Sequence, residues 1–119
     1  MNYSARKIYL TCDEHPLNEW AAFMRAHLDQ VAESLRDEKV RHEMWFSGRD
    51  EGGLFVIGVM DVDDHQASTT VTTASTLEVD QVHRAFKKHW DRARAQDLDI
   101  AKTHAPIFEH CALLFEAKP

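Results

Sequence analysis

Four stretches of the chain have the spacing and composition of apolar residues that predict β-strands. Apolar and polar positions alternate over residues 7–12 and over residues 40–47. Residues 54–62 are apolar on both faces, as in a central strand that is covered on both sides, and residues 107–116 are predicted as the last strand. The Gly-rich residues 48–53 predict a turn, so the second and third strands form a hairpin.

Two longer stretches repeat apolar residues at steps of three and four, which predicts amphipathic helices. The stripe of the first helix consists of Leu17, Trp20, Ala21, Met24, Leu28, Val31 and Leu35. The stripe of the second consists of Val79, Val82, His83, Phe86, Trp90 and Ala93. Residues 68–76, rich in Ser and Thr, are predicted to be a loop because β-branched residues are poor helix formers. Residues 97–106 are predicted to be a connector.

The order of these elements is strand, helix, strand, strand, helix, strand. With right-handed crossovers, this order predicts an α+β fold of the ferredoxin-like βαββαβ type. The expected architecture is an antiparallel four-stranded sheet with two helices on one face. The 119 residues provide one hydrophobic core, so residues 1–119 are expected to form a single domain.

The predicted helices cover one face of the sheet and leave the other face open. Tyr9, Trp45, half of the third strand and Phe108 or its neighbours are expected on this open face. Large exposed apolar patches mark interfaces or binding grooves. We therefore expect a homodimer in which two sheets pack face to face around a barrel-like core. The alternative is a monomer whose open face is itself the ligand groove.

Three segments resemble an uncharacterised bacterial family that carries only a domain-of-unknown-function label. They are the hairpin of residues 40–60, the pair Asp63-Asp64 and residues 80–86. That family is similar to the dimeric α+β barrel group, so the resemblance implies a dimer of the barrel type. Wider relatives of the barrel group include cofactor-free monooxygenases, haem-degrading enzymes, small lyases and non-catalytic proteins. The resemblance therefore implies a fold and does not select an activity.

The resemblance also implies functional positions. It places Glu43, Asp64 and His83 on the recurrent polar positions of the family. The chain departs from the family in its Thr-rich stretch before the second helix, which leaves the local geometry of that stretch open.

Charge and hydropathy exclude several classes of partner. The formal net charge is −6, whereas nucleic acids and anionic membranes are bound by basic surfaces. The longest apolar run, residues 54–60, is too short to span a bilayer. The N-terminus has no long apolar stretch after its charges, so it does not resemble a secretory signal. We expect a cytoplasmic protein with no nucleic-acid or membrane partner.

The Cys and His residues form no pattern typical of a metal or cofactor site. Cys12 and Cys111 have no paired spacing and are expected to be reduced thiols. Of the eight His residues, His42 and His110 are expected at opposite edges of the sheet and His83 on the helix side. A metal needs three or four converging ligands, so we predict no metal. No phosphate or nucleotide motif is present, and no cofactor is predicted.

The candidate ligand-binding residues are Tyr9, Glu43, Trp45, His83 and His110. Glu43 and Trp45 share a face of their strand and are expected to line one pocket with Tyr9 and His110. A carboxylate beside aromatic rings holds its proton more tightly, which suits a general base. The alternative is a Glu43 exposed to water or in a salt bridge. His83 is either a proton carrier at the end of the pocket or a paired core imidazole.

Two functions from different classes fit these features. The first is a homodimeric protein that binds a small organic molecule in a sheet-lined cavity, where catalysis without a cofactor remains open. The second is a non-catalytic homodimeric interaction module, in which the same face forms only the dimer core. A pocket with converging polar groups distinguishes the first from the second. The sequence favours binding and assigns no reaction.

Overall fold

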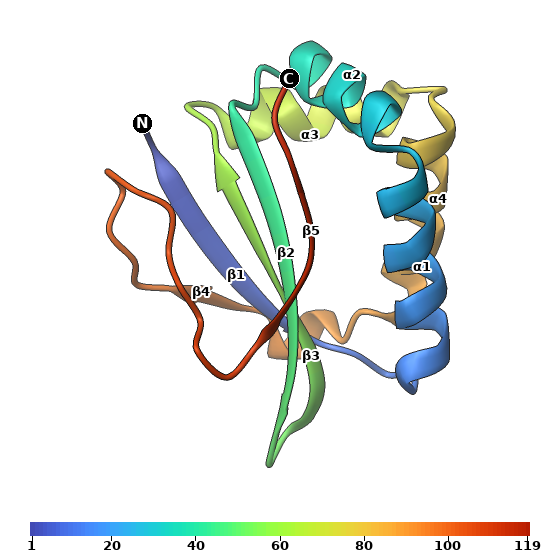
Figure 1. The fold of residues 1–119 in the computed structure, drawn as a ribbon, viewed down its shortest axis with the longest axis vertical. Coiled ribbons are helices and arrows are strands. Elements are labelled where there is room, and N and C mark those ends of the chain that lie inside the picture. Colours follow the sequence, from blue (N-terminus) through green and yellow to red (C-terminus); the bar gives the residue numbers. More distant parts are fainter.

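Four α-helices lie on one side of a five-stranded sheet in the computed structural model, which describes residues 1–119 (Figure 1). The strands are β1 (Tyr3–Tyr9), β2 (His42–Asp50), β3 (Gly53–Asp61), β4 (Gln96–Leu98) and β5 (Ala112–Ala117). The helices are α1 (Glu14–Ala26), α2 (Leu28–Glu38), α3 (His65–Ala74) and α4 (Glu78–Phe86), followed by the short 3₁₀ turns η1 (Lys87–His89) and η2 (Arg92–Arg94). None of the helices combines the length and apolar character needed to cross a bilayer.

The sheet has the strand order β4-β1-β3-β2-β5, and each pair of neighbours is antiparallel. The α+β class agrees with the sequence prediction. The ferredoxin-like βαββαβ fold with four strands and two helices is wrong, because the chain forms five strands and four helices. The dimeric α+β barrel type that was predicted with it is wrong for the same reason. The differences arise at one helix break, one predicted loop and the C-terminal quarter of the chain.

A single residue interrupts the first predicted helix. His27 leaves helical geometry, with φ −128° and ψ 37°, so α1 ends at Ala26 and α2 begins at Leu28. The His27 Nδ1 lies 2.8 Å from the carbonyl oxygen of Phe23, and the two rings stack with centroids 4.0 Å apart. The imidazole therefore satisfies a carbonyl that the end of α1 leaves without a partner.

The Thr-rich segment that was predicted to be a loop forms α3 instead. Asp64 caps its N-terminus by accepting a hydrogen bond from the backbone N–H of Ala67. Four hydroxyls donate to the carbonyl four residues earlier, namely those of Thr69, Thr70, Thr72 and Thr73. This back-bonding satisfies the hydroxyls inside the helix, and the prediction from helix propensity alone did not include it.

The C-terminal strand is shorter than predicted and lies at a different edge. It begins at Ala112 rather than at residue 107, and it pairs with β2, where Trp45 lies opposite Phe115. The position beside β1 is taken by the three-residue strand β4, inside the predicted connector. Residues 99–111 join β4 to β5 and cross the face of the sheet that the helices leave open (Figure 1).

Each face of the sheet has its own cluster of buried apolar side chains. The helix-facing cluster includes Ile8, Trp20, Trp45, Val56 and Phe115. The cluster on the opposite face consists of Tyr3, Ala5, Tyr9, Phe46, Phe55, Ile57 and Val59. The predicted alternation along β2 is present, but the prediction that Trp45 and Glu43 lie on the open face is wrong, because β2 turns these side chains toward the helices.

The open face of the sheet is covered by the chain itself. Side chains of the connecting segment pack against it, namely those of Leu98, Ile100, Ala105, Phe108 and Cys111. Phe108 contacts Phe46 edge to face with ring centroids 5.0 Å apart. The seven residues of the cluster on this face are each no more than 8% exposed. Homodimerisation stays a prediction. The exposed apolar face from which it was predicted is covered by the connecting segment.

One buried imidazole joins three strands on this covered face. His42 of β2 lies 2.9 Å from the hydroxyl of Tyr3 on β1 through Nδ1, and 2.8 Å from a carboxylate oxygen of Glu116 on β5 through Nε2. A carboxylate can only accept, so Nε2 donates to Glu116, while Nδ1 shares its hydrogen bond with the Tyr3 hydroxyl. His42 thus links β1, β2 and β5.

Candidate ligand-binding cavity

A cavity of about 940 Å³ lies between the sheet and the helices and continues around the β1–β4 edge to residues of the opposite face, which include Tyr3, Ala5, Leu98 and Ile100. Its wall includes the side chains of β2 and β3 that point toward the helices, together with residues of α2, α3 and α4. At the β1–β4 edge it is lined by the exposed residues Arg6, Asp97 and Lys102, so it opens to solvent there. The interior end is lined by Trp45, Trp90 and a group of ionisable side chains.

Gly58 makes room in the sheet for the indole of Trp45. The two residues lie opposite each other on β3 and β2. A Cβ atom at position 58 would lie 2.7 Å from the Trp45 ring, which is closer than real Cβ contacts come. The absence of a side chain at Gly58 therefore lets the indole lie across the neighbouring strand, where it forms part of the cavity wall.

Three carboxyl groups come together at the interior end. Glu38 is the last residue of α2, Glu43 lies on β2 and Asp80 lies in the first turn of α4. Ser34 donates a hydrogen bond to Asp80 at 2.7 Å, and the Thr72 hydroxyl of α3 is hydrogen-bonded to Glu38. Glu38 and Asp80 are each 7% exposed.

Burial changes the proton affinity of two of these groups. Loss of hydration, reinforced by the charges of Glu43 and Asp80, raises the pKa of Glu38 from 4.5 to about 8. Loss of hydration also raises the pKa of Glu43 to about 7, although a hydrogen bond with Trp45 and the charge of Lys87 oppose the change. Glu43 therefore exchanges a proton near neutral pH, which is the property required of a general acid or base.

His83 lies in the centre of an aromatic cluster. Its ring centroid is 5.7 Å from that of Trp20, 5.4 Å from that of Trp45 and 5.9 Å from that of Trp90. Desolvation, with smaller effects of Lys87 and Arg84, lowers the pKa of His83 to about 3. The imidazole is therefore neutral at physiological pH and is able to accept or donate a hydrogen bond.

Two hydrogen-bond donors in the wall lack ordinary partners. The indole Nε1–H of Trp90 is buried and makes no hydrogen bond. Lys87 is half-buried and lines the cavity, and it takes part in none of the ion pairs of the structure. Unsatisfied buried donors are uncommon in proteins and are satisfied by a ligand or by water at many functional sites.

The structure brings three of the five predicted site residues together. Glu43, Trp45 and His83 line this one cavity. Tyr9 lies on the opposite face of the sheet, where its hydroxyl donates to the carboxylate of Asp50 at 2.8 Å. His110 is exposed in the segment before β5. The predicted pocket that combined Tyr9, Glu43, Trp45 and His110 is therefore wrong, because it rested on the reversed face of β2.

The sequence prediction missed Glu38, Asp80 and Lys87 as cavity residues. A signal for Glu38 was present: it follows Val31 and Leu35 at helical spacing, so it continues the apolar stripe of its helix. Asp80, His83 and Lys87 are likewise three and four residues apart, which places them on one side of α4. No group of three or more His, Cys, Asp or Glu residues has the arrangement of a metal site.

Sequence comparison assigns these residues to a family. The profile of a family of unknown function, DUF6176, matches residues 11–111. The chain belongs to this family. The match includes Glu38, Glu43, Asp80, His83 and Lys87, so the interior end of the cavity lies inside the segment that defines DUF6176. No curated protein matches the chain, and no solved structure matches it.

Proposed function

We propose that the cavity between the sheet and the helices binds a small organic molecule that carries oxygen acceptors. The observation that carries this proposal is the convergence of ionisable groups from α2, β2 and α4 in one solvent-connected cavity whose wall also contains the indoles of Trp45 and Trp90. Sites for small molecules are typically concave and largely apolar, with a few converging polar groups. The lining of this cavity fits that description.

The choice of oxygen acceptors follows from the donors in the wall. Trp90 presents a buried N–H without a partner, and Lys87 presents an ammonium group without an ion pair. Glu38, with a pKa of about 8, is mostly protonated at neutral pH, and Glu43, with a pKa of about 7, is protonated in about half of the molecules, so both are able to donate a hydrogen bond. A carbonyl, carboxylate or hydroxyl oxygen satisfies such donors, whereas an amine ligand adds further donors to them.

The proposal is tested with a set of small ketones, carboxylic acids and amines of similar size. Binding is measured by the shift in Tm and by quenching of tryptophan fluorescence, because Trp45 and Trp90 lie in the wall. Oxygen-bearing compounds are expected to bind and amines are not. Native mass spectrometry of untagged protein examines whether a molecule is retained from the cell.

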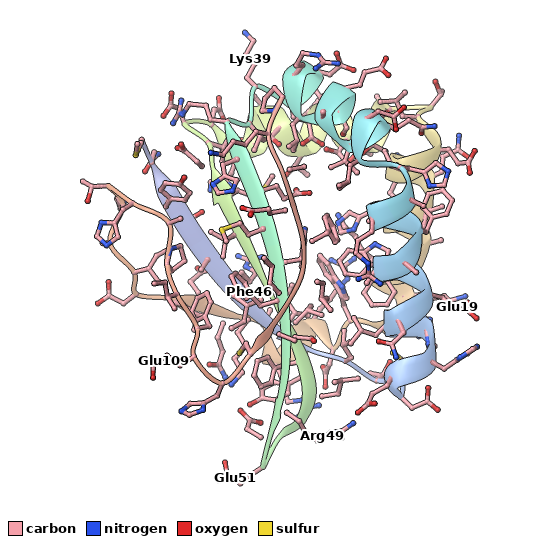
Figure 2. All side chains as sticks on the ribbon, viewed as in Figure 1. Glu19, Lys39, Phe46, Arg49, Glu51 and Glu109 are labelled. Carbon is pink, nitrogen blue, oxygen red and sulfur yellow. The ribbon has the colours of Figure 1, made fainter.

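Two variants show whether the binding occurs in this cavity. Met60 lines the cavity and is partly buried, so Met60→Trp fills part of the space and is expected to remove binding. Glu109 is exposed at the periphery, as Figure 2 shows, and Glu109→Gln is expected to leave binding unchanged. If no compound binds, or if Met60→Trp binds as well as the parent, the proposal is wrong.

A further inference from the structure

Lys87 differs from its neighbour Lys88 in solvent exposure and in its position at the cavity. Both belong to the short turn η1 that follows α4. The side chain of Lys88 is exposed, whereas that of Lys87 is half-buried and lines the cavity. The Lys87 Nζ lies 5.2 Å from the centroid of the Trp90 ring, so its ammonium group sits against an aromatic face rather than beside a carboxylate.

Charged groups on four elements influence the amine. Burial lowers the pKa of Lys87, and the positive charges of Arg92 on η2 and Arg84 on α4 lower it further. Glu38 of α2 and Glu43 of β2 act in the opposite direction. Desolvation and neighbouring cations are the two conditions under which proteins convert a lysine into a nucleophile at neutral pH.

From this placement we propose that Lys87 forms an imine with an aldehyde or ketone that enters the cavity. The inference rests on the proposed ligand cavity and narrows its ligand class to carbonyl compounds. The amine provides the nucleophile, and Glu43 on the facing strand provides the acid. The half-burial of both groups limits competition from bulk water.

The step balances without an oxidant or reductant. The neutral amine attacks the carbonyl carbon, and one of its protons passes to the carbonyl oxygen to give a carbinolamine. The Glu43 carboxylic acid then donates its proton to that hydroxyl, which leaves as water while the nitrogen lone pair forms the C=N bond. The products are an iminium ion, a Glu43 carboxylate and one water molecule. Addition of water reverses the sequence.

The test uses benzaldehyde as the probe, with sodium cyanoborohydride to reduce the iminium ion to a stable secondary amine. The full chain is treated at pH 7 for short times, and labelled peptides are quantified by mass spectrometry. Lys87 is expected to be labelled several-fold faster than Lys88, because its lowered pKa raises the fraction of neutral, nucleophilic amine at pH 7.

Matched variants separate a reactive lysine from a structural one. Lys87→Arg keeps the positive charge and is expected to remove the fast labelling, while Lys88→Arg leaves it unchanged. Glu43→Gln is expected to slow labelling at Lys87 and not at Lys88. Labelling of Lys87 that is no faster than that of Lys88 overturns the inference. If ketones still bind in a Met60-dependent way in that case, the ligand cavity stands and only the imine is excluded.

Discussion

Replacement of Glu38 by Gln is expected to stabilise the protein at alkaline pH and to have little effect at acid pH. Glu38 is 7% exposed, and the charges of Glu43 and Asp80 act on it. The carboxyl group is accommodated in its protonated form. Gln has nearly the same shape and no charge, so it reproduces the protonated form at all pH values.

The sign follows from the order of the two pKa values. In the unfolded chain a Glu releases its proton near the ordinary value of 4.5, whereas in the folded chain Glu38 holds it up to about 8. Between these values the folded state binds more protons than the unfolded state. The contribution of Glu38 to the free energy of unfolding therefore falls as the pH rises from 4.5 to 8, and this contribution changes no further above pH 8.

The magnitude is large relative to the total stability of a small domain. The difference between pKa values of about 8 and 4.5 corresponds to about 5 kcal/mol. Part of the change in Glu38 comes from Glu43 and Asp80, which also respond to the substitution, so roughly 3 to 5 kcal/mol is expected for the single variant. Domains of this size unfold with about 5 to 15 kcal/mol.

The assay is urea unfolding followed by tryptophan fluorescence at pH 5, 6, 7, 8 and 9, with the parent and Glu38→Gln compared at each pH. His83, whose pKa is lowered to about 3, causes a loss of stability as the pH falls below 6.5, but this contribution is common to both proteins and cancels in the difference. Glu33→Gln is the matched control, because Glu33 is exposed on the same helix. A difference between parent and Glu38→Gln that does not grow between pH 5 and pH 9 would refute this account of the buried carboxyl group.

Two further substitutions test the contact of Gly58 with Trp45 in the cavity wall and the hydrogen bond of His42 with Tyr3 in the sheet. Gly58→Ala is expected to lower the free energy of unfolding by about 1 to 3 kcal/mol, because the new Cβ would lie 2.7 Å from the Trp45 ring. Urea unfolding measures this loss, and an unchanged midpoint contradicts it. His42→Phe is expected to cost about 1 to 3 kcal/mol, since it leaves the buried Tyr3 hydroxyl without its partner. Hydrogen exchange should then be faster in β5, and exchange as slow as in the parent contradicts the proposed link.

The pattern of apolar residues located most of the regular elements but not the face of β2. Alternation along residues 40–47 separates Trp45 from Phe46, yet both are aromatic and both are buried. The sequence alone does not state which of two apolar faces meets the helices. The face is set by pairing with β3, where Gly58 accommodates the Trp45 ring.

The C-terminal quarter could not be predicted because its structure depends on contacts distant in the sequence. The strand β4 has three residues, too few for a periodic pattern, and it exists through its pairing with β1. Phe108 was expected in a strand but lies in the segment that covers the open face. The strand β5 pairs with β2. The residues of these two segments alone do not determine this pairing, because strand formation depends on the neighbours in the folded sheet.

The candidate site was predictable where polar residues interrupt an apolar stripe. Glu43 and His83 stood out because each lies beside aromatic residues in a regular element. Glu38 and Lys87 were overlooked because charged residues at the ends of helices are mostly solvated. In this fold Glu38, at the end of α2, and Lys87, directly after α4, line the cavity.

The position of β4 and β5 at the two edges of the sheet has a consequence for synthesis on the ribosome. The three central strands are complete at Asp61 and Trp90 precedes both edge strands, whereas Phe115 of β5 also lines the cavity. A nascent chain that ends before residue 96 thus lacks part of the cavity wall, and it has two bare strand edges and an uncovered apolar face. Such edges and faces recruit other chains. The strands β4 and β5 and the segment between them therefore protect the chain against aggregation, and removal of residues 96–117 is expected to lower both the yield of folded protein and ligand binding.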